Sequence, residues 1–382
     1  MHNDVSVLSS GSVRSVLMTA DAVGGVLTYA LSLATELAKT GTKTHLAMMG
    51  PKLRPAQEEA VRAVPGLVLH ESTYALEWMD EPWEDVARAG EWLRTLEAEV
   101  RPDIVHLNGY CHGAAGFTAP LVIVAHSCAL SWWESVERTE VPTRLSTYKE
   151  AVKRGLRAAH AVIAVSQSMR ASLECHYGPL PRMAVIPNGL ALDSRTPREK
   201  EPFVLAAGRL TDRAKNVEAL ARVAPRLKWP VKVAGADNLD ASTFGGVESL
   251  GWLPPDELVA VMERASIFVL PARYEPFGLS ALEAALRGCA LVLGDIPSLR
   301  EVWGEAAIYV RPDDDDGLAS AIDELVNDPA LRGEHAANAN LRAQLFTATR
   351  NARAMRDLYE TIILARRSPV VVNTSGRESR SA

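Results

Sequence analysis

Two glutamates at a fixed spacing form the most chemically informative segment of this 382-residue chain. The segment reads Glu275-Pro276-Phe277-Gly278-Leu279-Ser280-Ala281-Leu282-Glu283. Its proline and glycine predict a turn that opens a helix, whose first amides (Phe277, Gly278 and Leu279) would be free to meet an anion. Carboxylates are good acceptors for sugar and ribose hydroxyls. The segment therefore predicts a sugar-binding site; one capping and one ion-paired glutamate would be the structural alternative.

Two cations follow a predicted strand in the second half of the chain. Arg209 and Lys215 have five residues between them and precede the next helical pattern. A planar guanidinium fork and a compact ammonium suit a diphosphate, and both would stabilise charge on a departing nucleoside diphosphate. Arg213 competes for the arginine role, and ordinary surface cations in a solvated loop are the alternative.

A pair of glycines lies between the first predicted strand and the first predicted helix. Gly24 and Gly25 would let a phosphate or sugar approach the amides at the helix N-terminus. A plain strand-to-helix turn is the alternative. The segment lacks the GxGxxG pattern of nicotinamide-dinucleotide sites.

The elements that must position these residues alternate between short apolar runs and amphipathic helical stretches. This alternation predicts parallel sheets built from strand–helix–strand units. In the first half we expect strands at 15–18, 44–49, 67–70, 104–107, 121–125, 161–165 and 183–186, and in the second half at 203–207, 231–234, 248–250, 267–270, 290–293 and 308–310. We therefore predict an α/β protein with two Rossmann-like, doubly wound domains facing across a cleft, with the chemical residues at the carboxyl ends of strands. His126 follows one such strand.

The domain boundaries can also be predicted from composition. Residues 194–202 are polar and charged and contain two prolines, so we divide the chain into a first domain, 1–194, and a second domain, 195–345. A long helical pattern covers Leu341–Arg367. The tail, 368–382, is rich in Ser, Arg and Thr and is expected to be disordered.

These motifs resemble those of the retaining nucleotide-sugar transferases of glycosyltransferase family 4, which have the GT-B fold. The Glu-x7-Glu segment carries most of the resemblance, and it is supported by the glycine pair, by His126 and by Arg209 with Lys215. Further similar motifs are Val165-Ser166, Ile186-Pro187-Asn188-Gly189, Gly251-Trp252-Leu253 and Ser298-Leu299-Arg300-Glu301-Val302. The family more often has four residues between the Arg and the Lys, and a glycine where this chain has Asp237.

The resemblance implies a role for each matching position. Arg209 and Lys215 would hold the donor diphosphate, and Glu283 the ribose. Glu275, with the amides of residues 277–279, would hold the transferred sugar and the distal phosphate, while Gly25 and the backbone at Trp252 would contact the donor. His126 would lie near the reacting centre. The first domain would bind the acceptor and the second the donor, and the helix at 346–367 would cross back to the first domain.

Other features limit the function classes. A net charge of −6 and a pI near 5.9 argue against nucleic acid as a partner. Four cysteines without metal-site spacing indicate reduced thiols in a cytoplasmic protein, and no apolar run is long enough to span a membrane. The acidic run 313–316 precedes an amphipathic helix, so we expect capping rather than a metal site. We expect no cofactor; docking on a membrane is possible but nothing in the sequence indicates it.

The acceptor side is the least specified part of the prediction. Gly24, His126, Trp132 and Trp133 are the residues expected to contact an acceptor, with core packing as the alternative for the two tryptophans. We expect hexosyl transfer, with retention and without metal, from a UDP-, GDP- or ADP-sugar to a sugar, lipid or small-molecule hydroxyl. A nucleotide-sugar epimerase and a non-catalytic nucleotide-sugar binding protein are the alternatives, and a nicotinamide dehydrogenase is more distant.

Overall fold

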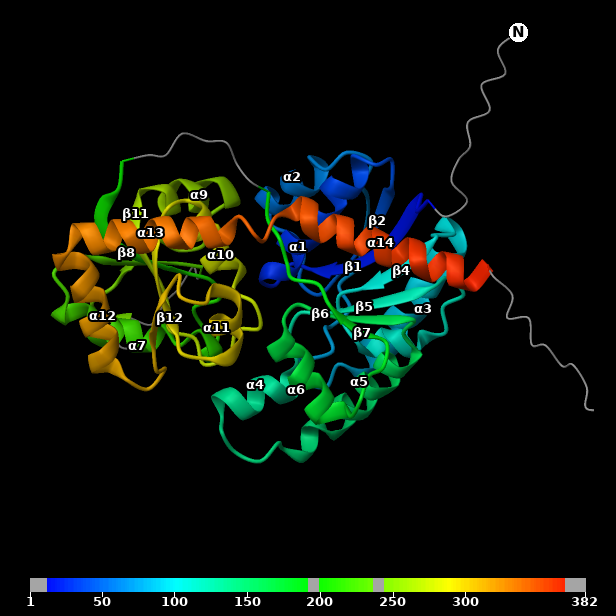
Figure 1. Ribbon diagram of the computed structural model, residues 1–382. Coiled ribbons are helices and arrows are strands. Elements are labelled where there is room, and N and C mark those ends of the chain that lie inside the picture. Colours follow the sequence, from blue (N-terminus) through cyan, green and yellow to red (C-terminus); the bar gives the residue numbers. More distant parts are fainter. Residues whose placement is uncertain (1–11, 192–198, 236–243, 368–382) are drawn as a thin grey trace, which may run out of the picture.

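The chain folds into two parallel-sheet domains joined side by side, as a computed structural model shows (Figure 1). The structure describes residues 12–191, 199–235 and 244–367. The predicted disordered tail, most of the predicted linker and Asp237 lie outside these residues. The expected fold class, two Rossmann-like doubly wound domains, is confirmed.

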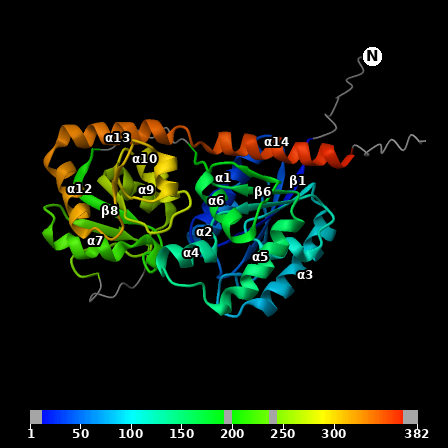
Figure 2. The ribbon, with the colours of Figure 1, turned by 60° about the horizontal axis from the view of Figure 1, so that its bottom comes forward.

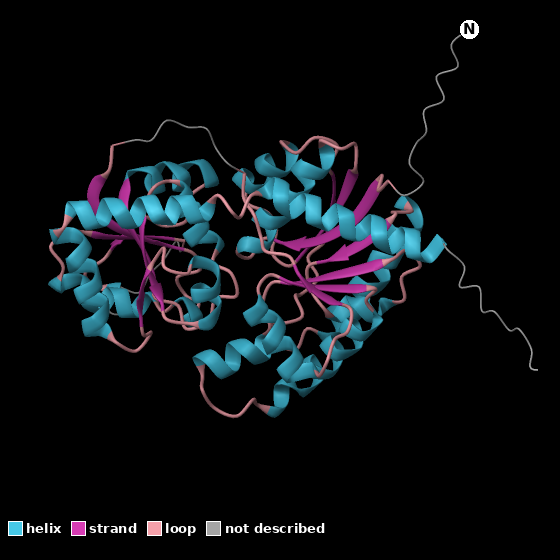
Figure 3. Cartoon of the chain, viewed as in Figure 1, coloured by secondary structure: helices cyan, strands magenta, loops and turns pink. Residues whose placement is uncertain are grey.

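The first domain is built on a seven-stranded sheet in the order β3-β2-β1-β4-β5-β6-β7. Its strands are β1 Ser15–Asp21, β2 Lys43–Met49, β3 Val68–Glu71, β4 Ile104–Leu107, β5 Leu121–Ala125, β6 Ala161–Ala164 and β7 Met183–Val185. Its helices are α1 Gly25–Ala38, α2 Pro55–Arg62, α3 Trp83–Val100, η1 Cys111–Ala115, α4 Ala129–Val136, η2 Thr143–Leu145, α5 Ser146–Ala158 and α6 Gln167–Tyr177. Figure 3 shows helices on both sides of the sheet, which explains why its central strands, such as β5 and β6, are apolar along their length.

The second domain repeats this plan with six parallel strands in the order β10-β9-β8-β11-β12-β13. Its strands are β8 Glu201–Ala207, β9 Val231–Ala234, β10 Glu248–Ser249, β11 Ala265–Leu270, β12 Ala290–Gly294 and β13 Ile308–Val310. Its helices are η3 Arg213–Lys215, α7 Val217–Val223, η4 Ala224–Arg226, α9 Pro255–Arg264, α10 Leu279–Leu286, α11 Pro297–Trp303, α12 Asp315–Asn327 and α13 Pro329–Ala343. Alternate residues of β8 enter different cores, Phe203 and Leu205 on one face and Val204 and Ala206 on the other.

The expectation of one helical run over Leu341–Arg367 was wrong. The helix α13 ends at Ala343, and a separate helix, α14 Ala348–Arg367, begins after a short turn. The turn forms because Leu190 takes the backbone groups there: its amide donates to the Phe346 carbonyl over 3.1 Å, and its carbonyl accepts from the Ala348 amide over 2.8 Å. Gly189 makes this approach possible, since a Cβ there would lie 2.2 Å from the Thr347 carbonyl oxygen.

The last helix returns to the first domain. Figure 2 shows α13 along the second domain and α14 continuing in the same direction along the first. The helix packs beside α1 and buries Met355 and Tyr359 completely.

The acidic run Asp313–Asp316 supplies the helix cap that the sequence predicts, because Asp314 caps α12 by accepting from the Gly317 amide over 2.8 Å.

Candidate active site

The candidate residues lie where the strand order of each sheet reverses. In the first sheet β1 lies between β2 and β4, and in the second sheet β8 lies between β9 and β11. Loops leaving the carboxyl ends of such neighbouring strands diverge and leave room for a ligand. Gly24 follows β1 and Asn108 follows β4, while Arg209 follows β8 and Glu275 follows β11. The two reversal points therefore supply most of the candidate site.

The glycine pair of the first domain meets the second domain directly. A Cβ on Gly24 would lie 3.6 Å from Nε of Arg209, and Gly24 has a φ of +90°, which favours glycine. A Cβ on Gly25 would lie 3.0 Å from a terminal methyl of Leu279, at the start of α10. The structure thus brings the first α1 turn, the arginine and the N-terminus of α10 together. We call this place the domain junction.

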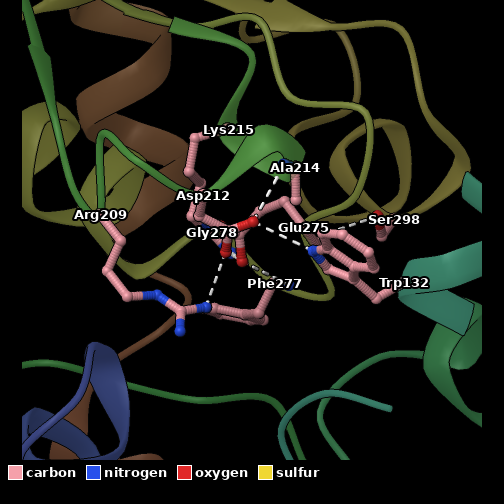
Figure 4. A network of polar contacts seen from close by, with 9 residues as sticks. All are labelled: Trp132, Arg209, Asp212, Ala214, Lys215, Glu275, Phe277, Gly278 and Ser298. Atoms are coloured by element: carbon pink, nitrogen blue, oxygen red, sulfur yellow. Dashed lines mark hydrogen bonds and ion pairs between the residues drawn. The ribbon is translucent and has the colours of Figure 1, made fainter. Parts of the chain in front are cut away.

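Lys215 and Glu275 form a buried ion pair beside the domain junction (Figure 4). Glu275 also accepts a hydrogen bond from the Gly278 amide over 2.9 Å, and the Phe277 amide lies at 3.4 Å. Burial alone would raise the pKa of Glu275, but the Lys215 charge and these hydrogen bonds outweigh it and hold the pKa below its usual value. The carboxylate is therefore ionised at neutral pH.

The same contacts correct one expectation about the helix N-terminus. The amides of Phe277 and Gly278 are not free, because the Glu275 carboxylate two and three residues earlier already accepts from them. The Phe277 ring is buried and packs edge-on against Phe346, with ring centroids 5.5 Å apart. The Phe277 side chain is therefore not placed to meet a ligand.

Arg209 is held by a carboxylate that the sequence analysis did not single out. Nη2 of Arg209 donates to Oδ2 of Asp212 over 2.8 Å. Oδ1 of Asp212 accepts from the Ala214 amide and from Nε1 of Trp132, each over 3.0 Å (Figure 4). Arg213, the competing arginine, points elsewhere and pairs with Glu137 over 2.5 Å.

Glu283 lies on α10 without a hydrogen bond to any other residue that the structure describes. Its surroundings include Leu282, Ala284 and Ala285, all fully buried, and the charge of Arg287 is near. Burial raises the pKa of Glu283 to about 7, against the lowering effect of Arg287. Hydroxyl donors from a ligand would supply the partners that this carboxyl group lacks.

His126 is part of a buried hydrogen-bonded chain. Asn108 Oδ1 lies 2.8 Å from Nε2 of His126 and 3.0 Å from Nε2 of His106. Because the Asn108 amide nitrogen donates to the Thr19 carbonyl over 2.7 Å, its oxygen can only accept, so both histidines carry their proton on Nε2. Nδ1 of His106 then accepts from the Tyr359 hydroxyl of α14, 2.5 Å away. Burial lowers the pKa of His126 to about 3, so the ring is neutral.

Two carboxyl groups on the first-domain side complete the surroundings. Burial raises the pKa of Asp21 to about 6, while the Val23 amide and the Arg209 charge oppose this rise and the Glu77 charge adds to it. Glu77 accepts from the amides of Tyr110 and Cys111, over 3.0 and 2.7 Å. Asp21 is therefore the titratable first-domain group that senses Arg209 most directly.

Of the three expected tryptophans, Trp252 and Trp132 contact the other domain, whereas Trp133 contacts residues of its own domain. Trp252 stacks against Arg54, whose guanidinium carbon is 4.4 Å from the ring centroid. Trp133 instead bonds within its own loop, its Nε1 donating to the Thr139 hydroxyl over 3.1 Å. The acceptor role expected of Trp132 and Trp133 stays a prediction, and the contact made by Trp132 is to the second domain.

Two motifs of the resemblance also join the domains. Ser166 caps α6 and donates its hydroxyl proton to the Pro276 carbonyl over 2.8 Å. Glu301 of α11 accepts from the Gln167 and Ser168 amides, over 2.7 and 2.8 Å, at the N-terminus of α6. These contacts hold the turn that carries Glu275 against the first domain.

Sequence reasoning missed Asn108, Asp212 and Asp21. Asn108 follows β4 directly, so the rule that selected His126 after β5 could have found it. Asp21 ends β1, and two residues separate it from the glycine pair. Asp212 gave no signal, because its importance comes from contacts that only folding creates.

No group of three or more metal-ligating side chains and no membrane-spanning helix is present in the described part of the chain.

Known proteins share both halves of this arrangement. A profile described as Glycosyltransferase Family 4 matches residues 23–194, and one described as Glycosyl transferases group 1 matches residues 201–328. A glycogen synthase of Mycobacterium tuberculosis is 29% identical over 84% of this chain and 86% of its own length.

Solved structures with the same fold cover nearly the whole chain. A sucrose-phosphate synthase from Thermosynechococcus elongatus has a TM-score of 0.76 at 21% identity, and the match covers 92% of this chain and all of that one. The Anabaena protein HepE, solved in complex with UDP-glucose, has a TM-score of 0.71 at 17% identity, covering 91% of this chain and 99% of that one. With two parallel-sheet domains and both family profiles matched, this chain belongs to glycosyltransferase family 4 and has the GT-B fold.

Proposed function

We propose that the chain transfers a hexosyl group, with retention of anomeric configuration and without a metal ion, from a nucleoside diphosphate sugar to an acceptor hydroxyl. One observation carries the proposal: Arg209 and Leu279 of the second domain meet the Gly24–Gly25 turn of the first, and the Lys215–Glu275 pair lies at the N-terminus of the helix that Leu279 opens. Two cations there can neutralise a diphosphate, and the carboxylate and the glycine turn leave hydroxyl-binding groups beside it.

The donor lies in this proposal across the domain junction. Arg209 and Lys215 bind the diphosphate, Glu275 and the Leu279 amide bind the sugar, and Glu283 accepts from the ribose hydroxyls. The second domain is thus the donor domain and the first domain the acceptor domain. UDP-glucose is the first donor to test, because HepE was solved with it.

Retention is supported by the state of the nearby side chains. Glu275 is engaged by Lys215 and by the Gly278 amide, so it is not placed to accept the acceptor's proton. His126 is neutral, and its low pKa makes it a weak base. The departing phosphate oxygen, stabilised by Arg209 and Lys215, is then the group that takes the proton, on the face that it leaves.

The activity test is hydrolysis of UDP-, GDP- and ADP-glucose, followed by an acceptor screen with the donor that is turned over. NMR of the product reports its anomeric configuration. An inverted product would overturn retention and would point to Asp21 as the base. Turnover that EDTA abolishes and added Mg²⁺ restores would contradict metal independence.

The two alternatives give different products. A nucleotide-sugar epimerase would change the sugar of the donor with no acceptor present, and a binding protein would bind the donor without turnover.

We propose a cytoplasmic location, supported by the four unpaired cysteines, Cys111, Cys128, Cys175 and Cys289.

A further inference from the structure

The carboxylate of Asp212 joins the first domain to Arg209, the arginine that is proposed to bind the diphosphate. Its side chain is only 12% exposed, yet it has three polar partners. Arg209 and Ala214 belong to its own loop, whereas Trp132 comes from α4 of the first domain (Figure 4). A buried carboxylate with three hydrogen bonds is fixed in direction, so its partners are fixed with it.

Helix α4 contacts the second domain at both of its ends. At its start the Cys128 amide donates to the Tyr274 hydroxyl over 2.9 Å, one residue before Glu275. Past its end Arg138 pairs with Asp313 over 2.6 Å, and Glu137 pairs with Arg213 over 2.5 Å. Among these contacts, the indole N–H of Trp132 is the one that reaches the carboxylate holding Arg209.

Arg209 in turn is placed relative to both domains. Asp212 holds one edge of the Arg209 guanidinium group. Gly24 and the Asp21 charge of the first domain lie beside the same group. If the domains separated, the Trp132 bond would break, and Asp212 would keep only the partners in its own loop. The direction of the arginine then depends on whether α4 is docked.

We propose that Asp212 and Trp132 are positioning residues that couple closure of the two domains to the orientation of Arg209 toward the donor diphosphate. Trp132 acts through Asp212, and Asp212 acts through Arg209. This inference rests on the proposed function, since it assigns a task to the arginine that binds the diphosphate. It also gives Trp132 a role distinct from the acceptor contact expected of it.

The test compares three single variants with the wild-type enzyme. Trp132→Phe keeps an aromatic ring but removes the N–H donor. Asp212→Asn keeps an oxygen acceptor for Trp132 and Ala214 but removes the charge that holds Arg209. Arg138→Gln is the matched control, because it breaks a contact with the second domain that lies just past the end of α4 and does not involve Asp212.

We expect Trp132→Phe and Asp212→Asn each to raise the donor KM about tenfold, the effect of losing one charge-assisted hydrogen bond. The acceptor KM at saturating donor and the melting temperature of the donor-free protein should stay unchanged. Arg138→Gln should change the donor KM less than about twofold. The inference is wrong if Trp132→Phe behaves like Arg138→Gln, or if its effect appears as a lower melting temperature instead.

A double-mutant cycle checks the route through the arginine. Calorimetric titration with UDP, or with the diphosphate of whichever donor the wild type uses, measures binding without needing turnover. In an Arg209→Ala background, Trp132→Phe should weaken diphosphate binding no further. An undiminished effect in that background would contradict the inference, whereas a wild-type protein that binds and hydrolyses no nucleotide sugar would contradict the proposed function itself.

Discussion

The two domains contribute polar groups of opposite kinds to the domain junction. On the second-domain side the groups are charged and paired, Arg209 with Asp212 and Lys215 with Glu275. On the first-domain side the network of His126, Asn108 and His106 is neutral, because burial lowers the pKa of both imidazoles and each ring keeps a single proton. A diphosphate is stabilised by cations, whereas a neutral hydroxyl can bind through neutral hydrogen-bonding groups. The charged pairs therefore come from the second domain, and the neutral hydrogen-bonded network comes from the first.

We expect the largest effect when a charged group of the second-domain side is removed. Arg209→Ala should lower kcat/KM for the donor by about a hundredfold to a thousandfold, because charge on the departing diphosphate loses its stabilising partner. Steady-state hydrolysis of the donor measures this. Arg213→Ala, on the same loop but paired with Glu137, should cost less than about threefold. Similar losses in both variants would contradict the assignment.

We expect the next largest effect when the neutral hydrogen-bonded network of the first domain is interrupted. Asn108→Leu leaves two buried imidazole N–H groups without an acceptor, so we expect kcat to fall at least about tenfold and the free energy of unfolding to fall by about 2–4 kcal/mol. Turnover assays and urea denaturation measure the two losses. In Asn108→Asp, the new carboxylate should raise the pKa of His126 from about 3, which NMR titration of the ring protons would detect. An unmoved His126 pKa would show that the hydrogen bond is absent.

A pH experiment on Glu283 sharpens the comparison within the charged side. Its carboxyl pKa rises from 4.5 to about 7 on folding, so the folded chain binds more protons in that window. Stability is therefore lost as pH rises from about 4.5 to 7. Glu283→Gln removes this loss, and we expect it to be about 1–2 kcal/mol more stable than wild type at pH 8 and equal to it at pH 4. Equal stability at both pH values would contradict the raised pKa.

The smallest effect concerns the far end of the neutral network. Tyr359→Phe removes the hydroxyl that donates to His106, and we expect a loss of about 1 kcal/mol in stability with kcat unchanged within about twofold. Thermal unfolding and a turnover assay are sufficient. A kcat loss as large as that of Asn108→Leu would extend the functional network to the C-terminal helix.

Much of the fold followed from the sequence, because apolar runs in a parallel sheet covered on both faces are nearly continuous. The expected strand at 121–125 matches β5 residue for residue, and that at 308–310 matches β13. The break between α13 and α14 could not be predicted, since the apolar spacing continues through it. Backbone contacts with Leu190, more than 150 residues earlier in the chain, end the helical hydrogen bonding there.

The sequence predicted those residues of the candidate site that follow the end of a strand. Arg209, Lys215, Glu275 and the glycine pair follow strands, and the fold brings them together. The partners that orient them were not predictable: Asp212 matters through a tryptophan 80 residues away, and Asn108 through two histidines and a tyrosine. The occupied amides at residues 277 and 278 show the same limit, because the Glu275 carboxylate accepts from them.

Diphosphate binding tests the central claim most directly. Calorimetric titration of UDP, GDP and ADP is carried out on the wild-type protein and on the double variant Arg209→Ala, Lys215→Ala. It compares the affinity for each diphosphate with and without the two cationic side chains. The account predicts that at least one diphosphate binds the wild type and that the double variant binds it at least about a hundredfold more weakly. Equal affinity in the two proteins would contradict it.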